Sequence, residues 1–89
     1  MTRLALRGEL GMPAAETLVM RLDELRHQRV SVILDLSQLN FMDSTGVSVL
    51  VRAINAAKEQ GVRLEIDRNL SPYVESRFRL TGLGEALGW

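Results

Sequence analysis

The residues of this 89-residue chain that are best suited to chemistry form one short run, Asp43-Ser44-Thr45-Gly46. The run follows an apolar segment and precedes a helical pattern of apolar residues, so we expect a turn from a strand into a helix. The first turn of a helix has backbone N–H groups without partners, and the helix dipole adds partial positive charge there. A phosphate on a hydroxyl at this place would be well accommodated. We therefore predict that Ser44 is exposed and is the functional centre.

The same four residues also have a purely structural interpretation as a helix N-cap. Asp and Ser are both preferred at that position, so the tetrapeptide alone does not separate a cap from a functional serine. In the functional interpretation, Gly46 removes bulk so that another protein's backbone can come close, and Asp43 adds a carboxylate beside the hydroxyl. A phosphate on Ser44 would then add a charge of about −1.5 to −2 beside that carboxylate.

A serine hydrolase explains Ser44 poorly. A nucleophile elbow requires glycine two residues before the serine, where this chain has Met42. The single histidine, His27, closes the preceding predicted helix, where it suits the helix dipole better than the role of a general base. The chain has no cysteine, so thiolate metal sites are excluded, and one histidine does not make a histidine site. We predict no enzymatic activity, no metal and no cofactor.

The charge balance and the lengths of the apolar segments argue against nucleic-acid binding and membrane insertion. Eleven basic and eleven acidic residues give a formal net charge of zero, so the chain has no field that would hold nucleic acid. No segment reaches the ~20 apolar residues of a membrane span, and the N-terminus lacks the apolar stretch of a signal peptide. We expect residues 1–89 to form one small cytoplasmic domain with no direct membrane insertion and no nucleic-acid partner.

The elements that must position Ser44 follow a β-α-β-α-β-α order, read from alternating and helical patterns of apolar residues. They are a strand at 3–7, a turn at 8–11, a helix at 13–28, a strand at 30–36, a connection at 37–42, a helix at 43–60, a strand at 62–67, a helix at 72–81 and a short helical turn within 83–89. Right-handed crossovers predict a mainly parallel sheet of three or four strands with helices packed on it. Both sheet edges would be open, which makes a homodimer a further hypothesis.

Two details of the middle strand affect the site. Its almost continuous apolar run predicts burial on both faces. Asp35 breaks the run toward the edge where α/β sheets meet ligands, but we favour a structural role in which its carboxylate accepts N–H groups of the following loop. After it, Leu39, Phe41 and Met42 are expected to close the end of the sheet.

Three blocks of sequence, covering almost the whole chain, resemble a STAS domain of the anti-sigma-factor antagonist type. The blocks are Leu6-Arg7-Gly8-Glu9-Leu10, then Val32-Ile33-Leu34-Asp35-Leu36-Ser37 with Phe41-Met42-Asp43-Ser44-Thr45-Gly46-Val47, and finally Ser71-Pro72 with Leu80-Thr81-Gly82-Leu83. Their order and spacing are far more specific than the tetrapeptide alone. The resemblance implies a small α/β fold of the STAS type over residues 1–89.

The resemblance also implies a mechanism. In this family the dephosphorylated antagonist binds an anti-sigma factor, commonly a serine-protein kinase of the histidine-kinase-like ATPase fold, and so releases a sigma factor. The kinase phosphorylates the serine that matches Ser44, which makes the antagonist let go, and a PP2C-type phosphatase reverses the step. The implied partner-binding residues are Asp43, Ser44, Thr45, Gly46, Val47 and Ser48.

A difference at Gly11 leaves a second function open. Antagonists of this family often have an aspartate at this place, in a turn that helps to contact the kinase. STAS domains that dock on ABC-type lipid transporters as accessory subunits keep a similar turn without the switch. The alternative hypothesis is therefore a non-switching docking subunit.

Overall fold

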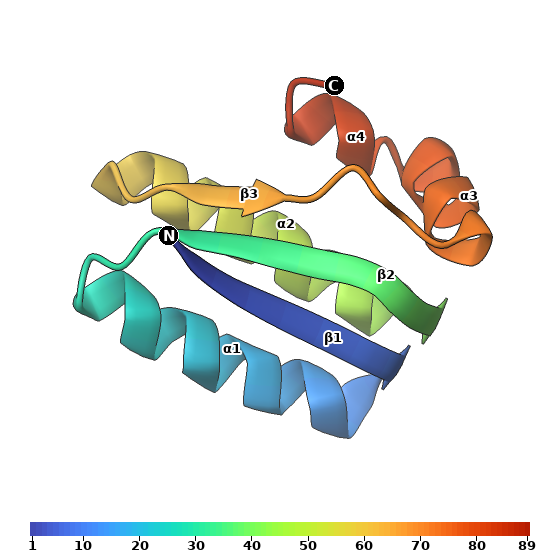
Figure 1. Cartoon of the computed structure of the whole chain (residues 1–89), viewed down its shortest axis with the longest axis horizontal. Helices are drawn as coiled ribbons and strands as arrows, with labels where there is room; N and C mark the ends of the chain where they lie inside the picture. Colours follow the sequence, from blue (N-terminus) through green and yellow to red (C-terminus); the bar gives the residue numbers. More distant parts are fainter.

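The protein, described over residues 1–89 by a computed structural model, is a three-stranded parallel sheet with four helices (Figure 1). The strands lie in the spatial order β1 (Thr2–Leu10), β2 (Val32–Met42) and β3 (Leu64–Ile66). The helices are α1 (Met12–His27), α2 (Ser44–Gln60), α3 (Pro72–Thr81) and the short α4 (Leu83–Ala86). This order confirms the predicted α/β class, with three strands in the sheet.

The sheet is buried on one face only. Val32, Leu34 and Leu36 of β2 are buried in a core shared with α1, α2 and α3. Between them, Ile33 and Asp35 point to the other face and remain partly exposed. The prediction that the middle strand is buried on both faces is wrong, because the helices leave the second face open to water.

Strand β2 continues through the segment that the sequence predicts as a connection, so the prediction of a connection at 37–42 is wrong. Its register against β1 shifts at two places, and at each place β2 has one residue more than β1. Such β-bulges change which residues face the core. The buried positions therefore change from a spacing of two to a spacing of three, through Leu36, Leu39 and Met42.

Strand β1 likewise continues to Leu10, so the prediction of a turn at 8–11 is also wrong. Gly8 has a φ of +76°, a conformation that glycine adopts without strain, and the strand passes through it. Beyond it, Leu10 still pairs with Met42 of β2. The carboxyl ends of β1 and β2 therefore lie side by side, and α1 and α2 both begin there (Figure 1).

The end of α2 and the start of α3 agree with the prediction from the sequence. Gly61, with a φ of +67°, ends α2 at the predicted place, and Ser71 caps α3 through the Val74 N–H. No strand pairs with the outer edges of β1 or β3, so a homodimer stays a prediction. None of the four helices combines the length and the apolar content that a membrane crossing requires.

Candidate functional site

Ser44 lies on the surface at the first residue of α2, directly after the carboxyl end of β2. The cap of this helix is the preceding residue, Asp43, whose Oδ1 accepts the Gly46 N–H at 3.0 Å. The structural interpretation of the tetrapeptide as an N-cap is therefore correct for Asp43. The carboxylate of Asp43 caps the helix, and the hydroxyl of Ser44 has no part in the cap.

The turn is fixed to β1 as well as to β2. The Asp43 N–H donates to the Leu10 carbonyl oxygen at 3.4 Å, and the Val47 N–H donates to the Asp43 carbonyl oxygen at 3.1 Å. Backbone groups on both sides of Ser44 are thus held by the folded chain. The hydroxyl is presented on a formed helix turn and not on an extended, flexible loop.

Gly46 has a different role from the one that the sequence suggests. It is buried, and an ideal Cβ on it would lie 2.5 Å from the Leu10 carbonyl oxygen and 2.9 Å from Met42 Cγ. The missing side chain therefore lets β1 pack against the start of α2. The expectation that Gly46 opens a path for another protein is wrong, because the space is filled from inside the domain.

The remaining predicted partner-binding residues are only partly on the surface. Ser48 is exposed one turn after Ser44, and these two hydroxyls lie on the outer side of α2. Thr45 and Val47 are half-buried, with Val47 packed against the core. Of the predicted set, Ser44 and Ser48 are thus the side chains that a partner could contact fully.

Gly11 lies next to this turn. It is the N-cap residue of α1, which has no side-chain cap, and its ideal Cβ would lie 3.4 Å from Asp43 Oδ2. The Asp43 carboxylate therefore caps α2 with one oxygen and faces the start of α1 with the other. An aspartate in place of Gly11 would set two carboxylates side by side here.

Sequence reasoning missed an aromatic pair beside Ser44. The sequence predicts that Leu39, Phe41 and Met42 close the end of the sheet. Leu39 and Met42 are buried as predicted, but 42% of Phe41 is exposed. Its ring stacks on Tyr73 of α3 with 6.1 Å between ring centroids. An aromatic residue three positions before the serine was the available signal, although its partner on α3 could not be read from local sequence.

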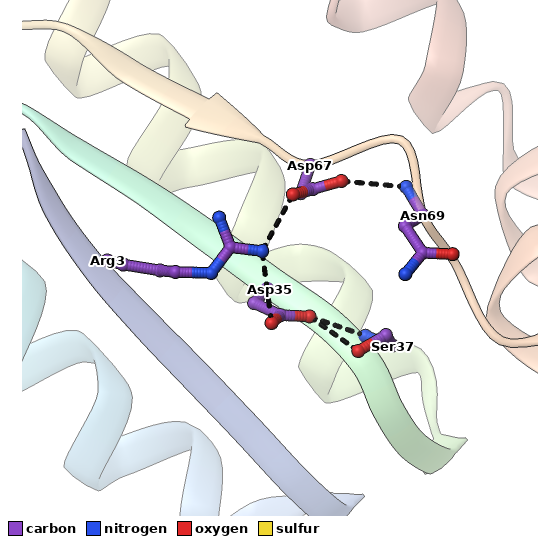
Figure 2. A network of polar contacts seen from close by, with 5 residues as sticks. All are labelled: Arg3, Asp35, Ser37, Asp67 and Asn69. Carbon is purple, nitrogen blue, oxygen red and sulfur yellow. Dashed lines mark hydrogen bonds and ion pairs between the residues drawn. The ribbon is translucent and has the colours of Figure 1, made fainter.

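The open face of the sheet carries a cluster of charged side chains (Figure 2). The Arg3 Nη2 atom of β1 donates to Asp35 Oδ2 at 3.1 Å and to Asp67 Oδ2 at 2.7 Å, and so connects three adjacent segments of chain. Asp35 Oδ1 also accepts the hydroxyl and the N–H of Ser37. The structural role predicted for Asp35 is confirmed, although the N–H that it accepts belongs to β2 itself.

Both carboxyl groups of this cluster titrate below their ordinary range. The hydrogen bonds from Ser37, and then that from Arg3, lower the pKa of Asp35. The Asn69 N–H, and then Arg3, lower the pKa of Asp67. The two carboxylates in turn raise the pKa of Arg3. All three groups are therefore charged at neutral pH.

The other titratable side chains form no reaction centre. His27 is the last residue of α1, and its Nδ1 lies 2.8 Å from the Asp23 carbonyl oxygen, a local contact at the helix end. No group of three or more histidine, cysteine, aspartate or glutamate side chains could hold a metal ion. Ser44 is thus an exposed hydroxyl at a helix start, away from any such group.

Comparison with known proteins agrees with this geometry. The family model for the STAS domain matches residues 2–87. The anti-sigma-B factor antagonist of Bacillus subtilis (strain 168) is 32% identical over 80 residues, which are 90% of this chain and 72% of that protein.

Solved structures show the same fold. The anti-sigma factor antagonist SpoIIAA in its unphosphorylated form matches with a TM-score of 0.71 and 26% identity, over 88% of this chain and 72% of that chain. The STAS domain of a SulP transporter from Vibrio cholerae matches with a TM-score of 0.72 and 25% identity, over 97% of this chain and 66% of that chain. Two further structures match over only 18% and 20% of their own, much longer chains.

The family model covers almost every element of the fold, from β1 to α4. The parallel sheet and the β2–α2 junction lie within the part that the family model covers. The sequence therefore belongs to the STAS domain family, and an anti-sigma factor antagonist is among its relatives.

Proposed function

We propose that this protein is a phospho-switched anti-sigma-factor antagonist, a binding protein and not an enzyme. With Ser44 unphosphorylated it binds an anti-sigma factor that is a serine-protein kinase of the histidine-kinase-like ATPase fold. Phosphorylation of Ser44 releases it, and a PP2C-type phosphatase restores it. The pathway requires ATP, so we place it in the cytoplasm. One observation carries the proposal: an exposed serine hydroxyl on the first turn of α2, in a helix that a different residue caps.

The division between Asp43 and Ser44 suits a switch. A phosphate on Ser44 leaves the hydrogen bond from the Gly46 N–H to Asp43 in place, so the helix keeps its cap. The new dianion would lie beside the Asp43 carboxylate, on a turn with no basic side chain between residues 38 and 51. The modification therefore changes the surface charge strongly while the fold is preserved.

That change in charge is large enough to release a partner. An interface that closes over a neutral hydroxyl has no cation to pair with a dianion. Burying an unpaired charge costs several kcal/mol. Since each 1.4 kcal/mol weakens binding about tenfold, one phosphate shifts the affinity by orders of magnitude.

Phosphorylation by a purified kinase tests the proposal. We expect the wild-type chain, mixed with the serine kinase of its source organism and ATP, to gain one phosphate on Ser44 by mass spectrometry. Ser44→Ala should gain none, while the matched controls Ser48→Ala and Thr45→Ala still gain one. Ser44→Asp should release the kinase only in part, because one carboxylate has less charge than a phosphate.

The same variants separate function from folding. Ser44→Ala and Ser44→Asp should unfold at the same temperature as the wild type, because Asp43 forms the cap. A wild-type chain that binds the kinase but is never phosphorylated would contradict the switch. Phosphate found on Thr45 or Ser48 would contradict the choice of Ser44.

A second candidate is a non-switching subunit that docks on a membrane transporter. The similarity to the STAS domain of a SulP transporter supports association with transporters in general, and an ABC-type lipid transporter is the form expected from the sequence. Purification of the tagged protein from its native cells separates the candidates. A membrane-bound ATPase complex supports docking, and a soluble serine kinase supports switching.

A further inference from the structure

We infer that the stacked rings of Phe41 and Tyr73 are the contact by which the kinase recognises the folded protein before it modifies Ser44. The inference rests on the function proposed above and adds a second part to the site. The rings contribute to the affinity whether or not Ser44 carries a phosphate, and the phosphate decides whether the partner stays bound.

Exposure is the first observation. Phe41 is 42% exposed although it stands between buried residues of the same strand, with Leu39 at 1% and Met42 at 0%. The two bulges of β2 place it on the surface, three residues before Ser44. Exposed aromatic rings that adjoin a binding surface are typical of the residues that contribute most to protein association.

The second observation is that the ring pair is already ordered in the free protein. The two rings lie at 21° to each other with centroids 6.1 Å apart, and the Tyr73 hydroxyl donates to the Met42 carbonyl oxygen at 3.1 Å. The start of α3 is fixed as well, because Ser71 Oγ donates to the Leu39 carbonyl oxygen at 2.7 Å. A partner that packs on these rings has little side-chain freedom to remove.

The third observation concerns the way in which Ser44 is presented. The hydrogen bonds of Asp43 to Leu10, Gly46 and Val47 hold the serine on a formed helix turn. A kinase cannot take this serine as an extended peptide without breaking them. It must instead recognise the folded surface around the hydroxyl. Phe41 stands only three residues before Ser44, so its ring lies within reach of a protein bound at the hydroxyl. The matching feature on the kinase is an apolar pocket beside its ATP site.

Steady-state kinetics with the purified serine kinase and ATP tests the contact. We expect Phe41→Ala to raise KM for the antagonist about tenfold or more with little change in kcat, because the serine itself is still presented in the same way. Tyr73→Phe keeps the stack but loses the bond to Met42, so we expect a smaller rise in KM. The matched controls are Met20→Ala and Leu80→Ala, whose side chains are 72% and 75% exposed elsewhere, and which should leave KM unchanged.

The affinity of the phosphorylated chain gives an independent measurement. Phe41→Ala should weaken binding of the kinase by the same factor with or without phosphate on Ser44, because the rings act in both states. A melting temperature checks that each variant is folded, and Phe41→Gln serves as a second variant in case Phe41→Ala is unstable.

The possible failures are distinguishable. If the kinase modifies the wild type and Phe41→Ala with equal KM, the ring contact is overturned and the switch stands. If the kinase neither binds nor modifies the wild type, both are overturned. A change in sedimentation of Phe41→Ala with no change in KM would show that a second copy of this chain covers the rings, which also overturns the inference.

Discussion

At the scale of single residues, the site depends on two neighbours of Ser44 that do different work. Asp43 accepts the Gly46 N–H and so caps the helix, and Gly46 lets β1 approach. Helix start and exposed serine are predictable from the sequence, because Asp and Ser favour these positions. The sequence does not predict which of the two residues forms the cap. It does not predict the need for glycine at position 46 either, because that need depends on the carbonyl of Leu10, which is distant along the chain.

Gly46→Ala tests the second of these roles. A Cβ atom here would meet the Leu10 carbonyl oxygen at 2.5 Å, and that oxygen belongs to a strand that cannot shift without disturbing the sheet. We expect a loss of about 3 kcal/mol in the free energy of unfolding, measured with urea, as for an overpacked core.

The control is Gly84→Ala, where a Cβ would lie at an ordinary distance of 3.7 Å from the Trp89 ring. This variant should be as stable as the wild type or slightly more stable. A Gly46→Ala protein of wild-type stability would show that β1 yields easily, and the account of this packing would then be wrong.

At the scale of elements, α3 is fixed to the carboxyl half of β2. Ser71 Oγ accepts the Val74 N–H at 3.3 Å and donates to the Leu39 carbonyl oxygen at 2.7 Å, so one side chain both caps the helix and fixes it to the sheet. The Ser-Pro pair predicts the cap from sequence alone. The hydrogen bond to Leu39 could not be predicted from the sequence. The bulges interrupt the alternation of buried and exposed residues around Leu39, so the sequence there predicts a connection and not a strand.

Removal of the Ser71 hydroxyl should therefore affect stability more than an average surface change. We expect Ser71→Ala to lower the free energy of unfolding by about 1–2 kcal/mol, since a cap and a partly buried hydrogen bond are lost together. Thr17→Ala, which removes an exposed hydroxyl bonded within α1, is the matched control and should change it by less than about 0.5 kcal/mol. Equal effects of the two substitutions in urea unfolding would refute this role of Ser71.

At the scale of the whole molecule, the Arg3 network connects β1 to β2 and to the residue that follows β3. Its partners Asp35 and Asp67 have lowered pKa values in the folded state, so protonation favours the unfolded chain. The stabilisation is complete above the ordinary carboxyl range near pH 4 and is lost as the pH falls through the lower folded-state values. Arg3 stays charged throughout this range.

The free energy of unfolding, measured from pH 7 down to pH 2, should show this loss. We expect the double variant Asp35→Asn, Asp67→Asn to be less stable than the wild type at neutral pH and to lose less stability below pH 4. Glu75→Gln removes an exposed carboxylate paired with Arg79 and should leave the slope unchanged. Equal slopes for the wild type and the double variant would show that the network does not control acid stability.

The parallel sheet and the order of its elements were predictable from apolar patterns, because those patterns are local. The network of Arg3 was not, because its partners lie on β2 and just beyond β3 and meet only when the sheet forms. The open second face of the sheet was not predictable either, because it depends on where the helices pack. An almost continuous apolar strand is typical of burial on both sides, whereas here the helices pack on one side only.

The separation of the cap from the hydroxyl has a consequence for the lifetime of the protein in a cell. Proteases remove a protein at a rate that depends on how often it unfolds. Because Asp43 and not Ser44 accepts the Gly46 N–H, a phosphate on Ser44, as proposed above, would leave the cap in place, and we expect both forms of the protein to be degraded at similar rates. Under the proposed function, each molecule could then pass through many rounds of phosphorylation, and the amount of the protein would not depend on its phosphorylation state.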